Sequence, residues 1–156
     1  MGANTYRRMA GFAAGAAPTR TDEVNGDEEG SLDDLTRAAK MVFSASLEEP
    51  LAWANSTLVR GDAVESVRAM KEDGLGPMRT IGSVSLCRSL LRAGLVDRFR
   101  VAMFPLITGA TGVERIYDGY PDVALDMIDQ RLFDGRIQMV EYRPRVLERP
   151  PLDPAA

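Results

Sequence analysis

The sequence predicts an α/β fold in which a mixed, mostly parallel sheet is flanked by helices and ends in a C-terminal antiparallel hairpin. Short apolar runs alternate with amphipathic helical patterns over the first two thirds of the chain. The run Met78–Val96, MRTIGSVSLCRSLLRAGLV, is typical of a strand that turns sharply into a helix. Near the end, Asp134-Gly135 separates two β-rich runs, and this dipeptide is a strong hairpin signal.

The composition indicates one ordinary globular domain. The chain has 156 residues, of which 45% are hydrophobic, and a net charge of −4. This charge argues against a nucleic-acid surface, which needs clustered Lys and Arg. No apolar run is long enough for a membrane span or a signal peptide. The single Cys87 excludes an internal disulfide and favours a cytoplasmic setting, where we expect it to be a core residue.

The absence of histidine limits the possible chemistry. It excludes a Ser-His-Asp triad, a Cys-His pair and a His-based zinc site within this sequence. The acidic run from Asp22 to Glu29 is more typical of a solvated surface than of a ligand set, so we expect no metal. Any reaction would therefore depend on a cofactor.

The N-terminal third combines helical and irregular patterns. Residues Gly2–Met9, GANTYRRM, are compatible with a capped helix start, either an ordinary one or one that faces a ligand. Residues 11–30 lack periodicity and predict a mobile loop. Ser31 with Asp34 resembles a capping box for a short helix that reaches about Ala39.

Two buried strands follow, Lys40–Ser44 and Thr57–Arg60, with Trp53 expected to pack over the sheet. Ser44 and Ser46 would offer hydroxyls at the carboxyl edge of the first strand, although serines are also common at strand ends that bind nothing.

The next two helices are predicted from their ends. Asp62 is read as an N-cap rather than as part of an adhesion motif, and its helix ends near Asp73. After a strand at Met78–Ile81, Ser83 caps the central helix and Gly94 ends it. A strand-to-helix turn of this kind exposes unpaired amides at the positive end of the helix dipole, so it favours a phosphate cradle. The alternative is a tight turn that uses glycine for steric reasons.

The last third is predicted as β structure. Arg98–Ile107 forms a strand that Pro105 bends or ends, which favours a sheet edge. The glycine loop at residues 108–112 is read as a turn, because it lacks the Lys of a P-loop. Val123–Phe133 and Arg136–Tyr142 form the hairpin, and residues 144–156 are expected to be a disordered tail.

The run from Ile81 to Gly109 resembles the reductase domain of the bifunctional riboflavin-biosynthesis deaminase-reductase, a relative of dihydrofolate reductase. The shared pattern is a Gly-Ser turn, a leucine-rich helix, a Gly-Leu-Val-Asp corner and a strand that ends in Pro before a glycine loop. MGANTY at the start and the LVRGD corner at Leu58–Asp62 are similar to further family motifs. The resemblance implies a dihydrofolate reductase-like domain over residues 1–143.

The resemblance also implies an NADPH-dependent oxidoreductase that transfers hydride to a heterocyclic or pyrimidine-type small molecule. The cofactor would meet three groups of residues. The central turn would wrap the pyrophosphate and nicotinamide side, a second helix would be capped onto the phosphates, and two serines would lie near the adenosine end. The residues of the central turn are Gly82, Ser83, Val84, Ser85 and Leu86. Those at the start of the second helix are Gly2, Asn4 and Thr5, and the two serines are Ser44 and Ser46.

Two departures from the family pattern stand out. Ala3 occupies a position where the family often has arginine, so the preference for NADPH over NADH is open. In the family, a first strand and a Ser-x-Asp-Gly-like loop precede the segment that resembles the start of this sequence. Three interpretations are open: a fragment, a chain whose true start lies upstream, or a degenerate reductase. A non-catalytic dimeric remnant is therefore the alternative function, and a homodimer is expected. No catalytic residue is predicted.

Overall fold

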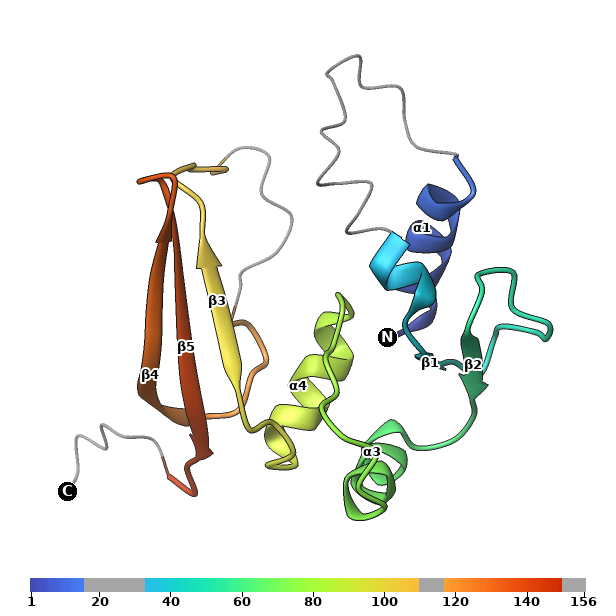
Figure 1. The fold of residues 1–156 in the computed structure, drawn as a ribbon. Coiled ribbons are helices and arrows are strands. Elements are labelled where there is room, and N and C mark those ends of the chain that lie inside the picture. The colour runs from blue at the N-terminus through green and yellow to red at the C-terminus, as the bar shows by residue number, and fades with distance from the viewer. Residues whose placement is uncertain (16–32, 110–116, 150–156) are drawn as a thin grey trace. The chain divides into compact units, whose positions relative to one another are not determined.

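The computed structural model describes residues 1–15, 33–109 and 117–149 (Figure 1). The chain divides into two compact units, Met1–Cys87 and Arg88–Ala156. Each unit is described by itself. Helix α4 (Val84–Arg92) spans the boundary, and its first four residues belong to the first unit.

The first unit contains a short parallel sheet. Strands β1 (Lys40–Phe43) and β2 (Ser56–Val59) pair in parallel, and both predicted strands are confirmed to within about one residue. Phe43 pairs with Val59 and also forms a parallel bridge with Gly2. Its amide donates to the Met1 carbonyl over 2.9 Å. The chain start therefore runs beside β1, on the side away from β2.

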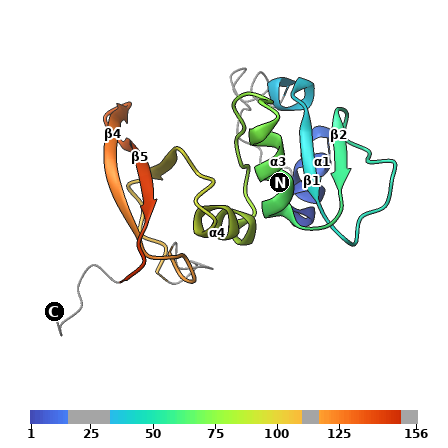
Figure 2. The ribbon, with the colours of Figure 1, turned by 90° about the horizontal axis from the view of Figure 1, so that it is seen from below.

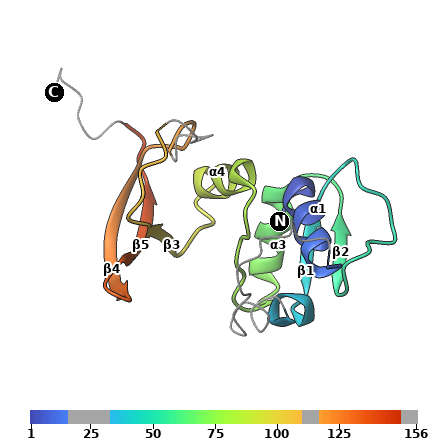
Figure 3. The ribbon, with the colours of Figure 1, turned by 90° about the horizontal axis from the view of Figure 1, so that it is seen from above.

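Helix α1 (Ala3–Ala13) begins directly after this bridge. It lies beside β1, as Figures 2 and 3 show, and its Tyr6 forms the core of the unit with Val42 and Trp53. The Tyr6 hydroxyl accepts a hydrogen bond from the Trp53 amide at 3.0 Å. The expected packing of Trp53 over the sheet is thus confirmed. The helix also includes the first three residues of the predicted loop at 11–30, so that boundary was wrong.

Lys40 joins β1 to the helical residues 33–37, which confirm the predicted short helix. Ser31, the residue predicted to cap this short helix, lies outside the described residues. The Lys40 ammonium donates to the carbonyls of Leu35, Thr36 and Ala38 over 2.8, 3.0 and 2.7 Å. It also lies 4.6 Å from the centre of the Trp53 ring. Because these carbonyls end a helix, the ammonium stabilises its negative end.

Helices α3 (Ala63–Glu72) and α4 both end as the sequence predicts. Gly74 and Gly94 have φ values of 70° and 68°, in the left-handed region. After α4, the amides of Gly94 and Leu95 donate to the carbonyls of Leu91 and Leu90 at 3.0 Å. This paired pattern closes the helix because it gives N–H donors to carbonyls that have none further along the helix.

The predicted strand at Met78–Ile81 is wrong. These residues are irregular, and 75–80 are exposed, with Met78 46% exposed. The pattern favoured a strand because the run is short and partly β-branched. A strand also needs a pairing partner, and a four-residue run does not specify one.

The second unit contains an antiparallel sheet in the order β3-β5-β4 (Figure 1). Its strands are β3 (Phe99–Met103), β4 (Val123–Phe133) and β5 (Ile137–Val146). The hairpin is confirmed, and Asp134 and Gly135 have the positive φ values, 49° and 65°, that a type I′ turn requires. Strand β3 lies at the edge, as expected, but is shorter than predicted.

Two further expectations for the sheet are corrected. Among the described strands only β1 and β2 are parallel, so the mostly parallel sheet was wrong. Strand β5 continues through Pro144 to Val146, into the predicted tail at 144–156. Pro144 pairs with Leu125 of β4, while the pairing with β3 stops at Tyr142. A proline is tolerated there because only one side of β5 has a neighbour.

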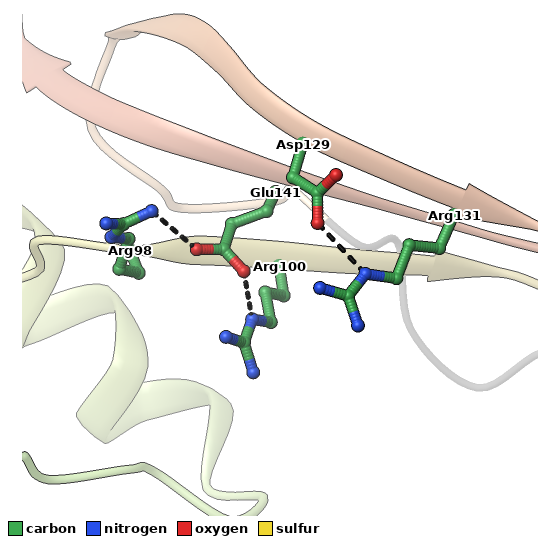
Figure 4. Close-up of polar contacts among 5 residues, drawn as sticks. All are labelled: Arg98, Arg100, Asp129, Arg131 and Glu141. Atoms are coloured by element: carbon green, nitrogen blue, oxygen red, sulfur yellow. Dashed lines mark hydrogen bonds and ion pairs between the residues drawn. The ribbon is translucent and has the colours of Figure 1, made fainter.

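One face of this sheet carries a row of charges (Figure 4). Glu141 on β5 accepts from Arg98 over 2.9 Å and also from Arg100, its partner on β3. Its side chain is only 11% exposed. The two guanidiniums, with the hydrogen bond from Arg100 first, hold the pKa of Glu141 below its ordinary value. On β4, Arg131 pairs with Asp129 at 3.0 Å.

Candidate functional site

Two of the helices that start in the first unit have, among the described residues, no side-chain cap on their first amides, so the cap expected at Ser83 is wrong. In α1 the first internal hydrogen bond runs from the Tyr6 amide to the Gly2 carbonyl, over 3.0 Å, and Gly2 supplies no capping side chain. In α4 the corresponding bond runs from Cys87 to Ser83, also over 3.0 Å. The amides before Tyr6 and Cys87 therefore have no acceptor within their helices. Neither first turn contains an acidic residue.

These two helix starts are in contact. A Cβ atom placed on Gly2 would lie 2.6 Å from the Ser83 hydroxyl, and one on Gly82 would lie 2.7 Å from Oγ1 of Thr5. A Cβ atom at either position would therefore force the neighbouring side chain to shift, and at Gly82 it would also be strained by the left-handed φ of 57°. The structure thus brings together Gly2, Thr5, Gly82 and Ser83, which the sequence places about 80 residues apart.

The turn into α4 is open to solvent. Gly82 and Ser85 are exposed, and Ser83 is half-buried. Gly82 and Ser83 have φ values of 57° and 59°, so two successive residues adopt the left-handed conformation. Leu86 is only 7% exposed, and any contact that it makes with a ligand would use its backbone amide. Val84, which is 37% exposed, borders the opening.

Helix α3 shows the opposite arrangement, and the predicted Asp62 cap is confirmed. The Asp62 carboxylate accepts from the amides of Val64 and Glu65 over 2.7 and 3.1 Å. Its negative charge occupies the positive end of the helix. An external anion would gain little there. The two helix starts suited to a phosphate are therefore those of α1 and α4.

The two predicted serines lie at the same edge of the sheet. Residues 44–47, which we call the serine loop, follow β1 directly after the residue that bridges Gly2. The Ser44 hydroxyl accepts from the amides of Ser46 and Leu47, each over 3.1 Å. The two hydroxyl oxygens are 3.4 Å apart. The loop is thus a closed turn that places both hydroxyls together.

Arg60 holds this loop from the neighbouring strand, and sequence reasoning missed its role. It follows β2 and donates to the carbonyls of Ala45 and Leu47, over 3.3 and 2.9 Å. The signal was present in the order of the elements, because parallel strands end at the same edge. Using it required the register Phe43 to Val59, which no local pattern supplies.

Other predicted residues have separate roles. Asn4 lies in the first turn of α1, where its amide oxygen accepts from Arg7 over 3.2 Å. The Cys87 thiol contacts the Thr80 hydroxyl and the Gly82 carbonyl, each at 3.5 Å, so it supports the turn rather than forming a reactive centre. Among the described residues no cluster of His, Cys, Asp and Glu could hold a metal ion. None of the described helices is long and apolar enough to cross a membrane.

The geometry can bind an anionic group such as a phosphate. Two uncapped helix starts in contact bring together amides with partial positive charge, and the two glycines allow this contact because Ser83 and Thr5 fill the space that a Cβ atom would need. The serine loop lies at the same edge of the sheet and offers two hydroxyls. No basic side chain is needed at the amides themselves.

Comparisons with known proteins identify the family. A family model described as the RibD C-terminal domain matches residues 15–139. A solved structure described as a riboflavin biosynthesis protein from Shewanella sp. PV-4 has a TM-score of 0.53 at 13% identity, over 83% of this chain and 84% of that one. A pyrimidine reductase-like protein from Corynebacterium diphtheriae has a TM-score of 0.57 at 15% identity, over 92% of this chain and 74% of that one.

The comparison with curated proteins gave no match. The two structural likenesses, at such low identities, establish the fold alone. The family match covers most of the chain and includes both the turn into α4 and the serine loop. This chain is therefore a member of the RibD C-terminal domain family.

Proposed function

We propose that this protein is a reductase of riboflavin biosynthesis that uses NADPH and acts on a heterocyclic, pyrimidine-type small molecule. The observation that carries the proposal is the contact between the uncapped starts of α1 and α4. The family match supports the reaction class, and one structural neighbour is described as pyrimidine reductase-like.

In this proposal the chain's own residues bind and orient the cofactor. The amides at the starts of α1 and α4 would hold the pyrophosphate, with Gly2 and Gly82 allowing the two helix starts to lie against each other. Ser44 and Ser46 would donate hydrogen bonds at the adenosine end. When bound, the cofactor supplies the hydride. The homodimer, the small-molecule substrate and the cytoplasmic location expected from the sequence stay predictions.

Direct titration with NADPH tests the proposal. Cofactor fluorescence should change saturably on adding the protein, and ADP-ribose should compete because it carries the same pyrophosphate. A Gly82→Ala variant should lose this binding, since its methyl group would displace Thr5. Gly74→Ala is the matched control, because Gly74 also has a left-handed φ, 70°, but no atom within 4 Å of its Cβ position.

Absence of binding by the wild-type protein at millimolar NADPH would end the proposal. Equal loss of binding in the two glycine variants would remove its structural basis. Oxidation of NADPH with a pyrimidine-type substrate then distinguishes an enzyme from the non-catalytic alternative, which would bind the cofactor without turnover.

A further inference from the structure

Besides the bond of 3.2 Å from the Ser44 amide to the Val59 carbonyl of β2, two sets of hydrogen bonds hold the serine loop. From inside, the Ser44 hydroxyl accepts from two amides of the loop. From outside, the Arg60 guanidinium donates to the carbonyls of Ala45 and Leu47. The two sets use different backbone atoms, so neither replaces the other. Loss of Arg60 would leave the loop held by its own turn and by the bond from the Ser44 amide to the Val59 carbonyl.

The planar shape of the guanidinium explains why this residue is an arginine. Its two terminal nitrogens reach two carbonyls that are two residues apart, 3.3 and 2.9 Å away. A lysine ammonium is a single point and cannot span both acceptors with the same geometry. Hydrogen bonds from a charged donor are also stronger than neutral ones.

The positive charge of Arg60 is not neutralised within the described residues. The guanidinium is exposed, its contacts are two neutral carbonyls, and no described carboxylate forms an ion pair with it. It carries more N–H donors than these two bonds use. The loop that contains the hydroxyls of Ser44 and Ser46 is therefore in direct contact with a positive charge that no described carboxylate pairs with.

We propose that Arg60 is a positioning residue for the nucleotide, which fixes the serine loop against the adenosine half of the cofactor. The inference rests on the proposed function and deepens it. Arg60 acts through the loop, so its removal should affect ligands that extend to the loop. It should spare ligands that reach only the amides of α1 and α4.

Two ligands separate these cases, NADPH and reduced nicotinamide mononucleotide, which lacks the adenosine half. Arg60→Gln should weaken NADPH binding about tenfold, the effect of roughly 1.4 kcal/mol, and leave the mononucleotide unchanged. Arg60→Lys keeps the charge but not the two-carbonyl contact, so it should restore only part of the affinity. Arg68→Gln, which removes an exposed guanidinium paired with Glu65 on α3, is the matched control and should bind both ligands normally.

Hydrogen exchange gives a readout that needs no ligand. The amides of Ser46 and Leu47 should exchange faster in Arg60→Gln than in the wild type, while those of α1 should not change. Normal NADPH affinity in Arg60→Gln would overturn the inference, and so would an equal loss for both ligands. Failure of the wild type to bind NADPH would instead overturn the proposed function. In that case the exchange experiment still tests the positioning role, because unchanged exchange of the loop amides in Arg60→Gln would reject it.

Discussion

Thr5 in the first turn of α1 lies directly against the α-carbon of Gly82, the residue that turns the chain toward α4. A Cβ atom on Gly82 would be 2.7 Å from the threonine Oγ1 and 2.9 Å from its Cγ2. Gly82 also has a φ of 57°. Two requirements, a left-handed backbone and space for a neighbouring side chain, therefore meet at one residue.

The variant Gly82→Ala should lower the free energy of unfolding by about 2–4 kcal/mol, because it adds left-handed strain to a steric overlap. Combining it with Thr5→Ala removes both overlapping atoms, so the double variant should recover the steric part. Urea unfolding of the two single variants and the double variant measures this coupling. Strictly additive effects would show that the two residues are not in contact in solution.

A carboxylate introduced at the start of α4 should stabilise the protein but weaken its binding of NADPH. Ser85→Glu places a negative charge in an exposed first turn, which should stabilise the helix by about 0.3–1 kcal/mol. The same charge should compete with the pyrophosphate and weaken NADPH binding at least tenfold, by titration. Ser85→Gln is the isosteric control. Unchanged NADPH binding in Ser85→Glu would show that the phosphates lie elsewhere.

Removal of the cap of α3 should lower stability and leave NADPH binding unchanged. Asp62→Ala leaves the amides of Val64 and Glu65 without their acceptor, so thermal unfolding should report a loss of about 1 kcal/mol. NADPH affinity should stay at the wild-type value, because α3 is not one of the proposed phosphate-binding helices. Asp62→Asn, which keeps the acceptor oxygen, should restore most of the stability. A strong loss of affinity in Asp62→Ala would contradict our choice of helices.

Acid should weaken the second unit through Glu141. Its folded pKa lies below the ordinary value of 4.5, chiefly because of the hydrogen bond from Arg100. The contribution to stability is therefore present above pH 4.5 and is lost as the pH falls through the lowered pKa. Glu141→Gln should be less stable than the wild type at neutral pH, and the difference should shrink in acid. Glu148→Gln, at an exposed position, should show no such pH-dependent difference in urea titrations.

Lys40→Met should cost about 1–3 kcal/mol, because three carbonyls at the end of the helix at 33–37 lose a charged donor. Burial lowers the pKa of Lys40 below its ordinary value. Fluorescence of Trp53, whose ring lies beneath the ammonium, should shift in the variant. Arg79→Met, at an exposed cation, provides the comparison. Equal stability of the two variants would remove this role for Lys40.

Features that depend on neighbouring residues could be predicted from the sequence. The Asp62 cap, the glycine that ends α4 and the Asp134-Gly135 turn each involve bonds within about five residues. The turn at Gly82 was also recognisable, and so was its pairing with the start of α1, through the family resemblance. Each of these elements has a side chain or a glycine that suits only a few backbone conformations.

Features that depend on strand pairing could not be predicted in the same way. The strand expected at Met78–Ile81 had suitable residues but no partner, and the strand order β3-β5-β4 follows from contacts between distant segments. The role of Arg60 depends on carbonyls 13 and 15 residues away. The contact of Tyr6 with Trp53 spans 47 residues. Such contacts are set by the packing of the whole unit.

The capped start of α3 has a consequence for how a ligand can be oriented. Asp62 follows β2, whereas α1 begins on the opposite side of β1, so a fixed negative charge stands at one side of this edge and free amides at the other. An anionic group would be held on the α1 side, where the first amides have no acceptor, and not at the start of α3, where the Asp62 carboxylate already accepts from them. A ligand with its anionic group at one end would be oriented by this difference between the two helix starts.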